Sequence, residues 1–279
     1  MPSNDVERIA AIEDPYQLLR VATERLNAAQ QEVTELSRLR RRVIQELHAQ
    51  GMSYAQIAKE AGLTRGRIHQ IRHTGPAPEG AFFGQGTITL ITPLKREARQ
   101  ARPVVAVEDV AAAKRLEDLA RGFDLAVELE HVPLGGDVNL NRPNLVVICG
   151  PRLSTVMGEL YERDPVLEWV KEDVWTLHDT RTGERYRSGS DDEPARPIDY
   201  AYLGRLPRPD GAGHVLVFTG IHPQGTLGVV RLLQTELAAL WGQVGDKPFS
   251  TVVATEYEPE SGEPVKVELA SPLYRHEEG

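Results

Sequence analysis

The residues with the clearest chemistry are cations gathered in one short part of the chain. Eight arginines and lysines lie between Arg38 and His73, opposed only by Glu46 and Glu60. This window therefore carries a net charge of +6, the other residues carry −15, and the 279-residue chain as a whole carries −9. Guanidinium groups suit phosphates and the edges of guanine bases, so any contact with double-stranded DNA is expected in the first third of the chain.

A second group of residues could bind an anion at two junctions between a strand and a helix. The first junction holds Gly150, Pro151, Arg152 and Ser154, and the second holds Gly220, His222, Gly225 and Thr226. Free N–H groups at a helix start favour anions, and open α/β sheets bind ligands at the carboxyl ends of their strands. We therefore expect both junctions to face one crevice for a small polar or anionic ligand, such as a nucleotide. The alternative is that the glycines serve turn geometry and Arg152 pairs with a local acid.

The elements that position the cations are predicted to be two short helices joined by a turn. We expect helices over Met52–Leu63 and Thr64–Arg72, with Gly62 in a left-handed turn conformation that is cheap for glycine. The side chains expected in the core are Ile57, Ala58, Leu63, Ile68 and Ile71. The candidate DNA contacts are Arg41, Ser53, Thr64, Arg65, Arg67, His69, Gln70 and Arg72.

The stretch from Leu39 to Arg72, which contains SYAQIAKEAGLTRGRIHQIR, resembles the helix-turn-helix of bacterial sigma-factor region four, as in small actinobacterial regulators. The resemblance implies that Thr64–Ile71 is a recognition helix that enters the major groove of DNA. This sequence departs from the sigma pattern at Gly66 and His69, where glutamate and arginine are common. The alternative is a three-helix packing module that binds no DNA.

A long helix is predicted ahead of this motif, because residues between Pro15 and Gln50 include no internal proline or glycine. Apolar side chains recur three and four residues apart, at Leu19, Ala22, Leu26, Ala29, Val33 and Leu36. Such a seam is typical of a coiled coil, so we expect a homodimer. The alternative is a break near Gln30 that lets the helix fold back on its own chain.

Beyond a linker at Thr74–Gly80, apolar strands alternate with helices. Strands are expected at Thr87–Thr92, Val104–Val107, Leu125–Val132, Leu145–Cys149, Val174–His178, Tyr200–Leu206 and Val215–Thr219, with a terminal hairpin at Ser250–Tyr257 and Val265–Leu269. Helices are expected at Glu108–Phe123, after Leu145–Cys149 as far as Tyr161, and at Gly225–Trp241. The chain is therefore predicted to be an all-α helix-turn-helix domain with a long helix (residues 1–78), followed by a three-layer α/β sandwich (residues 79–279) with helices on both faces of its sheet.

The sequence lacks the motifs that catalysis, metal binding and cofactor binding commonly require. No nucleotide-binding or hydrolase motif occurs, and the eight histidines lack metal-ligand spacing, so we expect no cofactor, metal or catalytic residue. The single cysteine, Cys149, is expected in the core, and it excludes a multi-cysteine zinc site. The start of the chain lacks the features of a signal peptide, and no apolar stretch reaches the roughly 18 residues of a membrane helix, so we expect a cytoplasmic protein without membrane contact.

One polar segment, Arg181–Pro197, has no core pattern and is expected to be a mobile loop or lid. The acidic residues around it are expected to be solvated or to lie in turns. They are Asp179, Asp191, Asp192 and Asp199.

These observations favour a dimeric, sequence-specific DNA-binding regulator of transcription whose α/β domain senses a small polar ligand without catalysis. An alternative is an enzyme acting on a nucleotide or nucleoside, localised to DNA by the N-terminal domain. Its candidate catalytic groups would be His222 and Asp179, with Arg152 as an anion clamp. A third possibility is that the α/β domain docks another protein, such as RNA polymerase.

Overall fold

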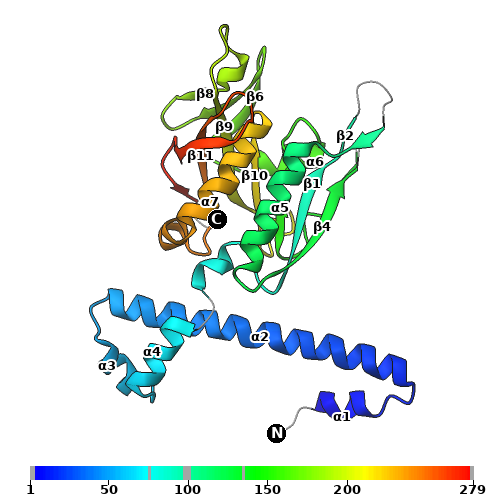
Figure 1. The fold of residues 1–279 in the computed structure, drawn as a ribbon, viewed down its shortest axis with the longest axis vertical. Coiled ribbons are helices and arrows are strands. Elements are labelled where there is room, and N and C mark those ends of the chain that lie inside the picture. Colours follow the sequence, from blue (N-terminus) through cyan, green and yellow to red (C-terminus); the bar gives the residue numbers. More distant parts are fainter. Residues whose placement is uncertain (1–3, 75–76, 97–101, 134–135, 277–279) are drawn as a thin grey trace. The chain divides into compact units, whose positions relative to one another are not determined.

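The computed structural model describes residues 4–74, 77–96, 102–133 and 136–276 of the chain. The chain divides into two compact units, Met1–Pro78 and Glu79–Gly279 (Figure 1). Residues 75 and 76 of the expected linker lie outside the described ranges, and its end forms part of a 3₁₀ helix, Pro78–Phe82.

The first unit consists of helices only, as expected. They are α1 (Asn4–Ala10), α2 (Pro15–Ala49), α3 (Tyr54–Glu60) and α4 (Arg65–Thr74). The α2 helix begins where the Asp14 side chain accepts backbone N–H groups of Tyr16 and Gln17, a capping arrangement that satisfies otherwise unpaired donors. Because α2 runs unbroken for 35 residues, the alternative with a break near Gln30 is wrong.

The core of the helix-turn-helix is small and aliphatic. Its buried members are Ile44, Ile57, Ala58, Ile68 and Ile71. The expectation that Leu63 belongs to this core is wrong, because its side chain is 36% exposed. Leu47, Met52 and Tyr54 pack against the cluster in its place, and Gly62 adopts the expected left-handed φ of +66°.

The second unit is a mixed α/β domain built on one large sheet. Its strands are, in order across the sheet, β12 (Pro264–Leu269), β11 (Phe249–Tyr257), β9 (Ile198–Pro207), β10 (His214–Gly220), β5 (Leu145–Val147), β1 (Thr87–Pro93) and β4 (Ala126–Val132), and β13 (Tyr274–Arg275) pairs with β11. The four strands from β10 to β4 are parallel, whereas β9 is antiparallel to both neighbours. The connection between β9 and β10 is too short for a crossover, so these strands can pair only in the antiparallel sense.

Two different layers cover this sheet. Helices α5 (Val107–Arg121) and α7 (Pro223–Val244) contact each other and bury one face (Figure 1). The other face is covered by the short helix α6 (Thr155–Tyr161) and by a small antiparallel sheet. The strands of that small sheet are β6 (Leu167–Lys171), β7 (Trp175–Asp179) and β8 (Arg185–Arg187). The expected fold class is confirmed, but the second covering layer is largely β-structure instead of helix.

Two segments differ from their expected structure. Instead of joining the main sheet, the apolar run at Val104 forms β3 (Pro103–Val104), which pairs with β2 (Lys95–Arg96) in a separate hairpin. The segment Arg181–Pro197, expected to be a loop, contains β8 and a 3₁₀ helix, Gly189–Asp191. Hydrogen bonds hold it to the main sheet, since the Ser190 hydroxyl lies 2.6 Å from that of Tyr257 on β11.

Candidate functional sites

The recognition helix α4 turns one face toward the core and leaves the other exposed. The Thr64 hydroxyl caps the helix by accepting the N–H of Arg67 at 3.1 Å, and Ile68 and Ile71 are buried. Helical periodicity then places the polar residues on the outer side. The exposed members of the predicted DNA contacts on α4 are Arg65, Arg67, His69 and Gln70.

The other predicted contacts are engaged within the unit. Ser53 forms a capping box with Gln56 at the start of α3, and its hydroxyl lies 2.8 Å from the Gln56 side-chain oxygen. The Arg72 guanidinium stacks 3.9 Å from the ring centroid of Tyr54 and is half-buried. Arg41 on α2 is also half-buried. The most accessible of the predicted DNA contacts are therefore those on the outer face of α4.

The basic window contains structural as well as exposed cations. Arg38 is 2% exposed and pairs with Glu35 at 2.5 Å, one turn earlier on α2. Sequence reasoning counted Arg38 with the basic surface, although the glutamate three residues before it is the signal for an intrahelical pair.

Both glycine-containing junctions of the α/β domain face one cleft beside the carboxyl ends of β5 and β10. The predicted residues that line it are Gly150, Arg152, Gly220, His222 and Thr226. Three others do not line it: Pro151, Ser154, which caps α6 by accepting the N–H of Met157, and Gly225. The cleft has free space of only about 20 Å³, which is room for about one water molecule.

The charged side chains of the cleft differ in their engagement. Lys95 pairs with Asp109 at 2.7 Å, and the His222 Nε2 atom lies 2.9 Å from the Asp191 carboxylate. Arg152 is exposed and forms no ion pair within the described ranges. Asp109 and Asp191 balance the charges of Lys95 and Arg152, so the positive charge that could meet an anion at the mouth of the cleft is that of the exposed Arg152.

Asp199 is the site residue that sequence reasoning missed. It is wholly buried, and its Oδ2 atom accepts the N–H groups of His222 at 2.9 Å and Gly225 at 2.7 Å. The N–H of Gly220 donates to the Thr226 hydroxyl. The expected free donors at the start of α7 are therefore largely occupied. Burial raises the pKa of Asp199 to about 6, so the expectation that this residue is solvated is wrong.

Asp179 is also buried, at 1% exposure, but it begins a turn, so of the two expected positions, solvated or in a turn, the second is the one observed. Burial opposes ionisation, but hydrogen bonds from the Tyr274 hydroxyl and from the backbone N–H groups of Thr182 and Arg181 hold the pKa of Asp179 below its usual value. Asp179 does not line the cleft. The structure therefore pairs His222 with Asp191 and does not bring it to Asp179.

Cys149 follows β5 and lies in the buried core on the α6 face of the sheet, and the expected core position is thus confirmed. Its side chain is 1% exposed, and burial raises the pKa of its thiol to about 12. The carbonyl oxygen of the same residue accepts a hydrogen bond from the Tyr161 hydroxyl of α6 at 2.9 Å.

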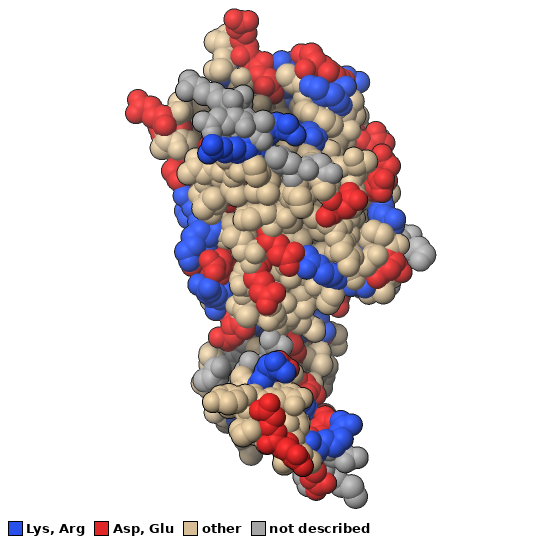
Figure 2. Space-filling view, turned by 90° about the vertical axis from the view of Figure 1, so that its right-hand side faces the viewer, with Lys and Arg blue, Asp and Glu red and all other residues tan. Residues whose placement is uncertain are grey.

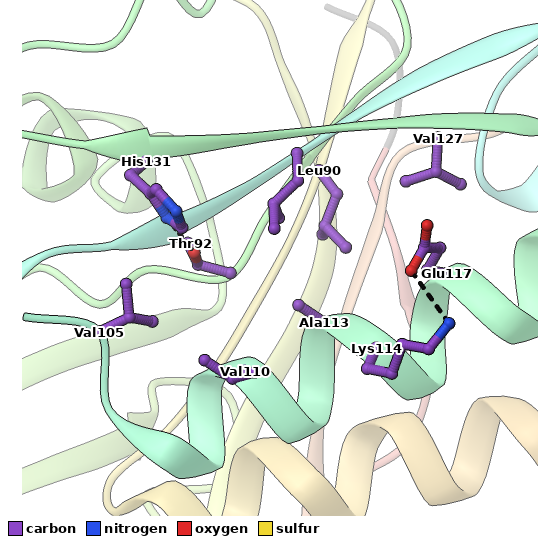
Figure 3. Close-up of a pocket in the computed structure, with 10 residues that line it drawn as sticks. Leu90, Thr92, Val105, Val110, Ala113, Lys114, Glu117, Val127 and His131 are labelled. Atoms are coloured by element: carbon purple, nitrogen blue, oxygen red, sulfur yellow. Dashed lines mark hydrogen bonds and ion pairs between the residues drawn. The ribbon is translucent and has the colours of Figure 1, made fainter.

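A separate apolar pocket of about 150 Å³ lies between α5 and the edge of the sheet (Figure 3). Val110 and Ala113 of α5 face Leu90 of β1 and Val127 of β4 across it. At one end the Thr92 hydroxyl hydrogen-bonds the His131 ring at 2.8 Å.

On the face seen in Figure 2, cations and anions of the α/β domain are intermixed and separated by uncharged surface, so this face presents no basic patch.

Comparison with known proteins finds a match for the N-terminal unit only. The family model described as Sigma-70, region 4 matches residues 24–75, which include α3, α4 and much of α2. The chain matches no curated protein and no solved structure. The expected resemblance is thus confirmed for the helix-turn-helix, and such a domain implies DNA binding. No helix within the described residues is long and apolar enough to cross a membrane.

Proposed function

We propose that this protein is a dimeric transcriptional regulator that reads a specific DNA sequence and responds to a small polar ligand. The observation that carries the DNA-reading part is the outer face of α4, where Arg65, Arg67 and Gln70 are exposed within the region matched by sigma-70 region 4. Arginine can bind guanine bidentately and glutamine can bind adenine in the same way, so this set can distinguish base pairs.

The exposed stripe of α2 supports the dimeric part of the proposal. Leu19, Leu26 and Val33 are 64%, 58% and 63% exposed although they occupy one heptad seam. Within the first unit α2 contacts α1, α3 and α4, yet these three side chains stay exposed. Pairing with a second copy would bury this stripe and present two recognition helices to two half-sites.

The cleft supports the sensing part of the proposal. The exposed Arg152 supplies positive charge beside the glycines of two loops, and this arrangement suits a carboxylate or phosphate. Because the free space holds about one water molecule, a larger ligand requires the loops to separate. That movement is the change that ligand binding would impose on the α/β domain.

The experiment that tests DNA reading uses duplexes selected by the full-length protein from a random pool. Fluorescence anisotropy should show that replacing Arg65, Arg67 and Gln70 together with alanine weakens binding at least hundredfold, since each base contact contributes about 1–3 kcal/mol. Arg231→Ala, which removes an exposed arginine of α7, serves as the matched control and should leave the affinity unchanged. Full affinity in the triple variant would refute the proposal.

One observation favours the enzyme alternative enough to keep it as a second candidate. The His222–Asp191 pair gives an imidazole an orienting carboxylate next to an exposed arginine, as general base catalysis requires. Under this alternative, incubation with nucleoside phosphates should yield products, detected by chromatography, and His222→Ala should abolish them. Absence of any product would remove it.

A further inference from the structure

A second polar pocket lies at the opposite end of the strands that lead to the cleft. Its free volume is about 300 Å³, compared with about 20 Å³ in the cleft. Leu145 and His214, the first residues of β5 and β10, line it together with residues 81–85. We call it the base pocket. Volumes of this size are typical of sites for small organic molecules.

The base pocket contains a buried cation, Arg205 of β9, which is 6% exposed. Its guanidinium donates to the carbonyl oxygens of Gly245, Lys247 and Phe82 at 2.8, 3.0 and 3.0 Å. It also lies 4.9 Å from the ring centroid of Phe82 and 5.4 Å from that of Phe249. These contacts fix the group in one orientation, so a ligand would meet a preorganised donor.

Carbonyl oxygens stabilise this guanidinium without neutralising it. A guanidinium has five N–H donors, and three of them are used by these carbonyls. No carboxylate within the described ranges pairs directly with Arg205, and Asp246, which attracts it through space, is exposed. Burial lowers the pKa of Arg205 to about 10, which leaves it a cation at neutral pH. A buried cation without a contacting counter-ion gains most from an anion.

A second arginine lines the same pocket. Arg208 is 9% exposed and is held by Asp210 through two hydrogen bonds, from Nε at 3.1 Å and from Nη2 at 3.0 Å. The remaining amino group of Arg208 is therefore positioned while its side chain is fixed. Asp210 balances the charge of Arg208, whereas Arg205 has no carboxylate in contact with it within the described ranges, so Arg205 is the cation that an anion would compensate.

We propose that the base pocket is a binding site for a small organic anion whose carboxylate or phosphate group is received by Arg205 and Arg208. The proposal goes beyond the sensing cleft and does not depend on it. Apolar atoms of Ala81 and Leu216 also line the pocket and suit the body of such a molecule. The competing explanation is that Arg205 serves only to tie three backbone segments together.

The location of this site gives it a direct connection to the entry of the chain into the α/β domain. Phe82 follows the boundary at Pro78 closely in sequence, and its carbonyl is bound by Arg205. Asn144, directly before β5, accepts the N–H of Gln85 at 3.2 Å and donates to its carbonyl at 2.7 Å. An anion on Arg205 would therefore touch the group that anchors this entry segment.

The test is isothermal titration of the full-length protein at constant ionic strength, with inorganic phosphate and benzoate as separate probes. We expect one site per chain for at least one probe, and the preferred probe identifies the head group. Ala212→Glu, at an exposed position of the lining, should weaken binding at least tenfold because it adds a negative charge. Ala212→Gln is the matched neutral control and should bind within about twofold of the original protein.

Arg208→Gln should also weaken binding, whereas Arg231→Gln on α7 should not. If Arg208→Gln fails to fold, the Ala212 pair still decides the outcome, since that side chain is exposed. No binding of either probe, or equal binding in Ala212→Glu and Ala212→Gln, would overturn the proposal. Binding lost in Arg152→Ala but kept in Ala212→Glu would assign the anion to the cleft, which overturns this proposal while supporting the sensing function.

Discussion

The recognition helix and the cleft contain similar residue types: arginine, histidine and small polar groups. The helix leaves these side chains exposed, whereas most of those in the cleft are bound by partners from distant parts of the chain. On α4 the Arg65 and Gln70 side chains lie on the exposed face. In the cleft, Lys95 is paired with Asp109, His222 is paired with Asp191, and the N–H groups at the start of α7 are bound by Asp199. Arg152 is exposed, as Arg65 and Gln70 are on α4.

The difference arises from the distance in sequence at which partners are found. The exposed face of α4 follows from a repeat of 3.6 residues and two buried isoleucines, so neighbouring residues decide it. The partners in the cleft come from α5, β9 and a 3₁₀ helix, which are brought together only by the fold. A glycine-rich loop therefore indicates where a site lies, but it does not show which donors remain free.

The largest expected effect tests whether the exposed apolar stripe of α2 forms the interface of a dimer. Replacing Leu26 and Val33 with glutamate should raise the dimer dissociation constant at least hundredfold, because two charges would enter a coiled-coil seam. Sedimentation velocity would measure it. Val265→Glu, at a 73% exposed aliphatic on β12, is the control. A dimer that persists in the double variant would place the interface outside α2.

An effect of similar size distinguishes the buried anchoring residues of the helix-turn-helix from its exposed residues. Ile68→Ala should cost about 2–5 kcal/mol of unfolding free energy, since Ile68 is 1% exposed and its loss leaves a cavity. Leu63→Ala should cost less than about 1 kcal/mol, because much of that side chain already contacts solvent. Urea denaturation of both variants measures the contrast. Equal losses would mean that Leu63 belongs to the core after all.

The next effect tests the burial of Asp199 beside the cleft through the dependence of stability on pH. The pKa of Asp199 is raised from 3.8 to about 6 in the folded protein, so the folded state holds this proton more tightly than the unfolded state. Stability from this group is complete below pH 3.8 and is lost as the pH rises through 6.

Between pH 4.5 and 7 the original protein should therefore lose about 2 kcal/mol relative to Asp199→Asn, which cannot titrate. Denaturant titrations of the two proteins at each pH give this difference, and other carboxylates cancel in it. A constant difference across the range would show that Asp199 has the same pKa in the folded and unfolded states, which would contradict the raised pKa.

The smallest effect concerns the type of contact made by one exposed residue. If Arg67 meets a phosphate, Arg67→Ala should reduce DNA affinity about tenfold and lower the slope of affinity against salt by about 1. Arg231→Ala should leave the slope unchanged. An unchanged slope in Arg67→Ala, with altered preference among sequences, would assign Arg67 to a base instead.

The sequence predicted the parts of the molecule that depend on local patterns. The helix-turn-helix, the long helix and the parallel strands beside β5 follow from periodicity, capping residues and apolar runs. The meeting of the two glycine junctions also followed from a general rule for α/β sheets. These features need no knowledge of which distant residues come into contact.

The parts that could not be predicted depend on distant contacts. Asp199 lies within β9 and is buried because the start of α7 offers it two N–H groups. Asp179 is buried through Tyr274, which lies near the other end of the chain. The Arg181–Pro197 segment shows no apolar periodicity in the sequence. It is held in place by hydrogen bonds to distant residues, such as that between Ser190 and Tyr257.

The burial of Cys149 has a practical consequence for spectroscopy. It is the only cysteine of the chain, and with a thiol pKa of about 12 it has almost no thiolate at neutral pH. Maleimide reagents react with thiolates, so the folded protein provides an unreactive background without mutation. A cysteine introduced at an exposed position, such as Val265 on β12 or Ala212 in the base pocket, would carry the only fluorophore or spin label.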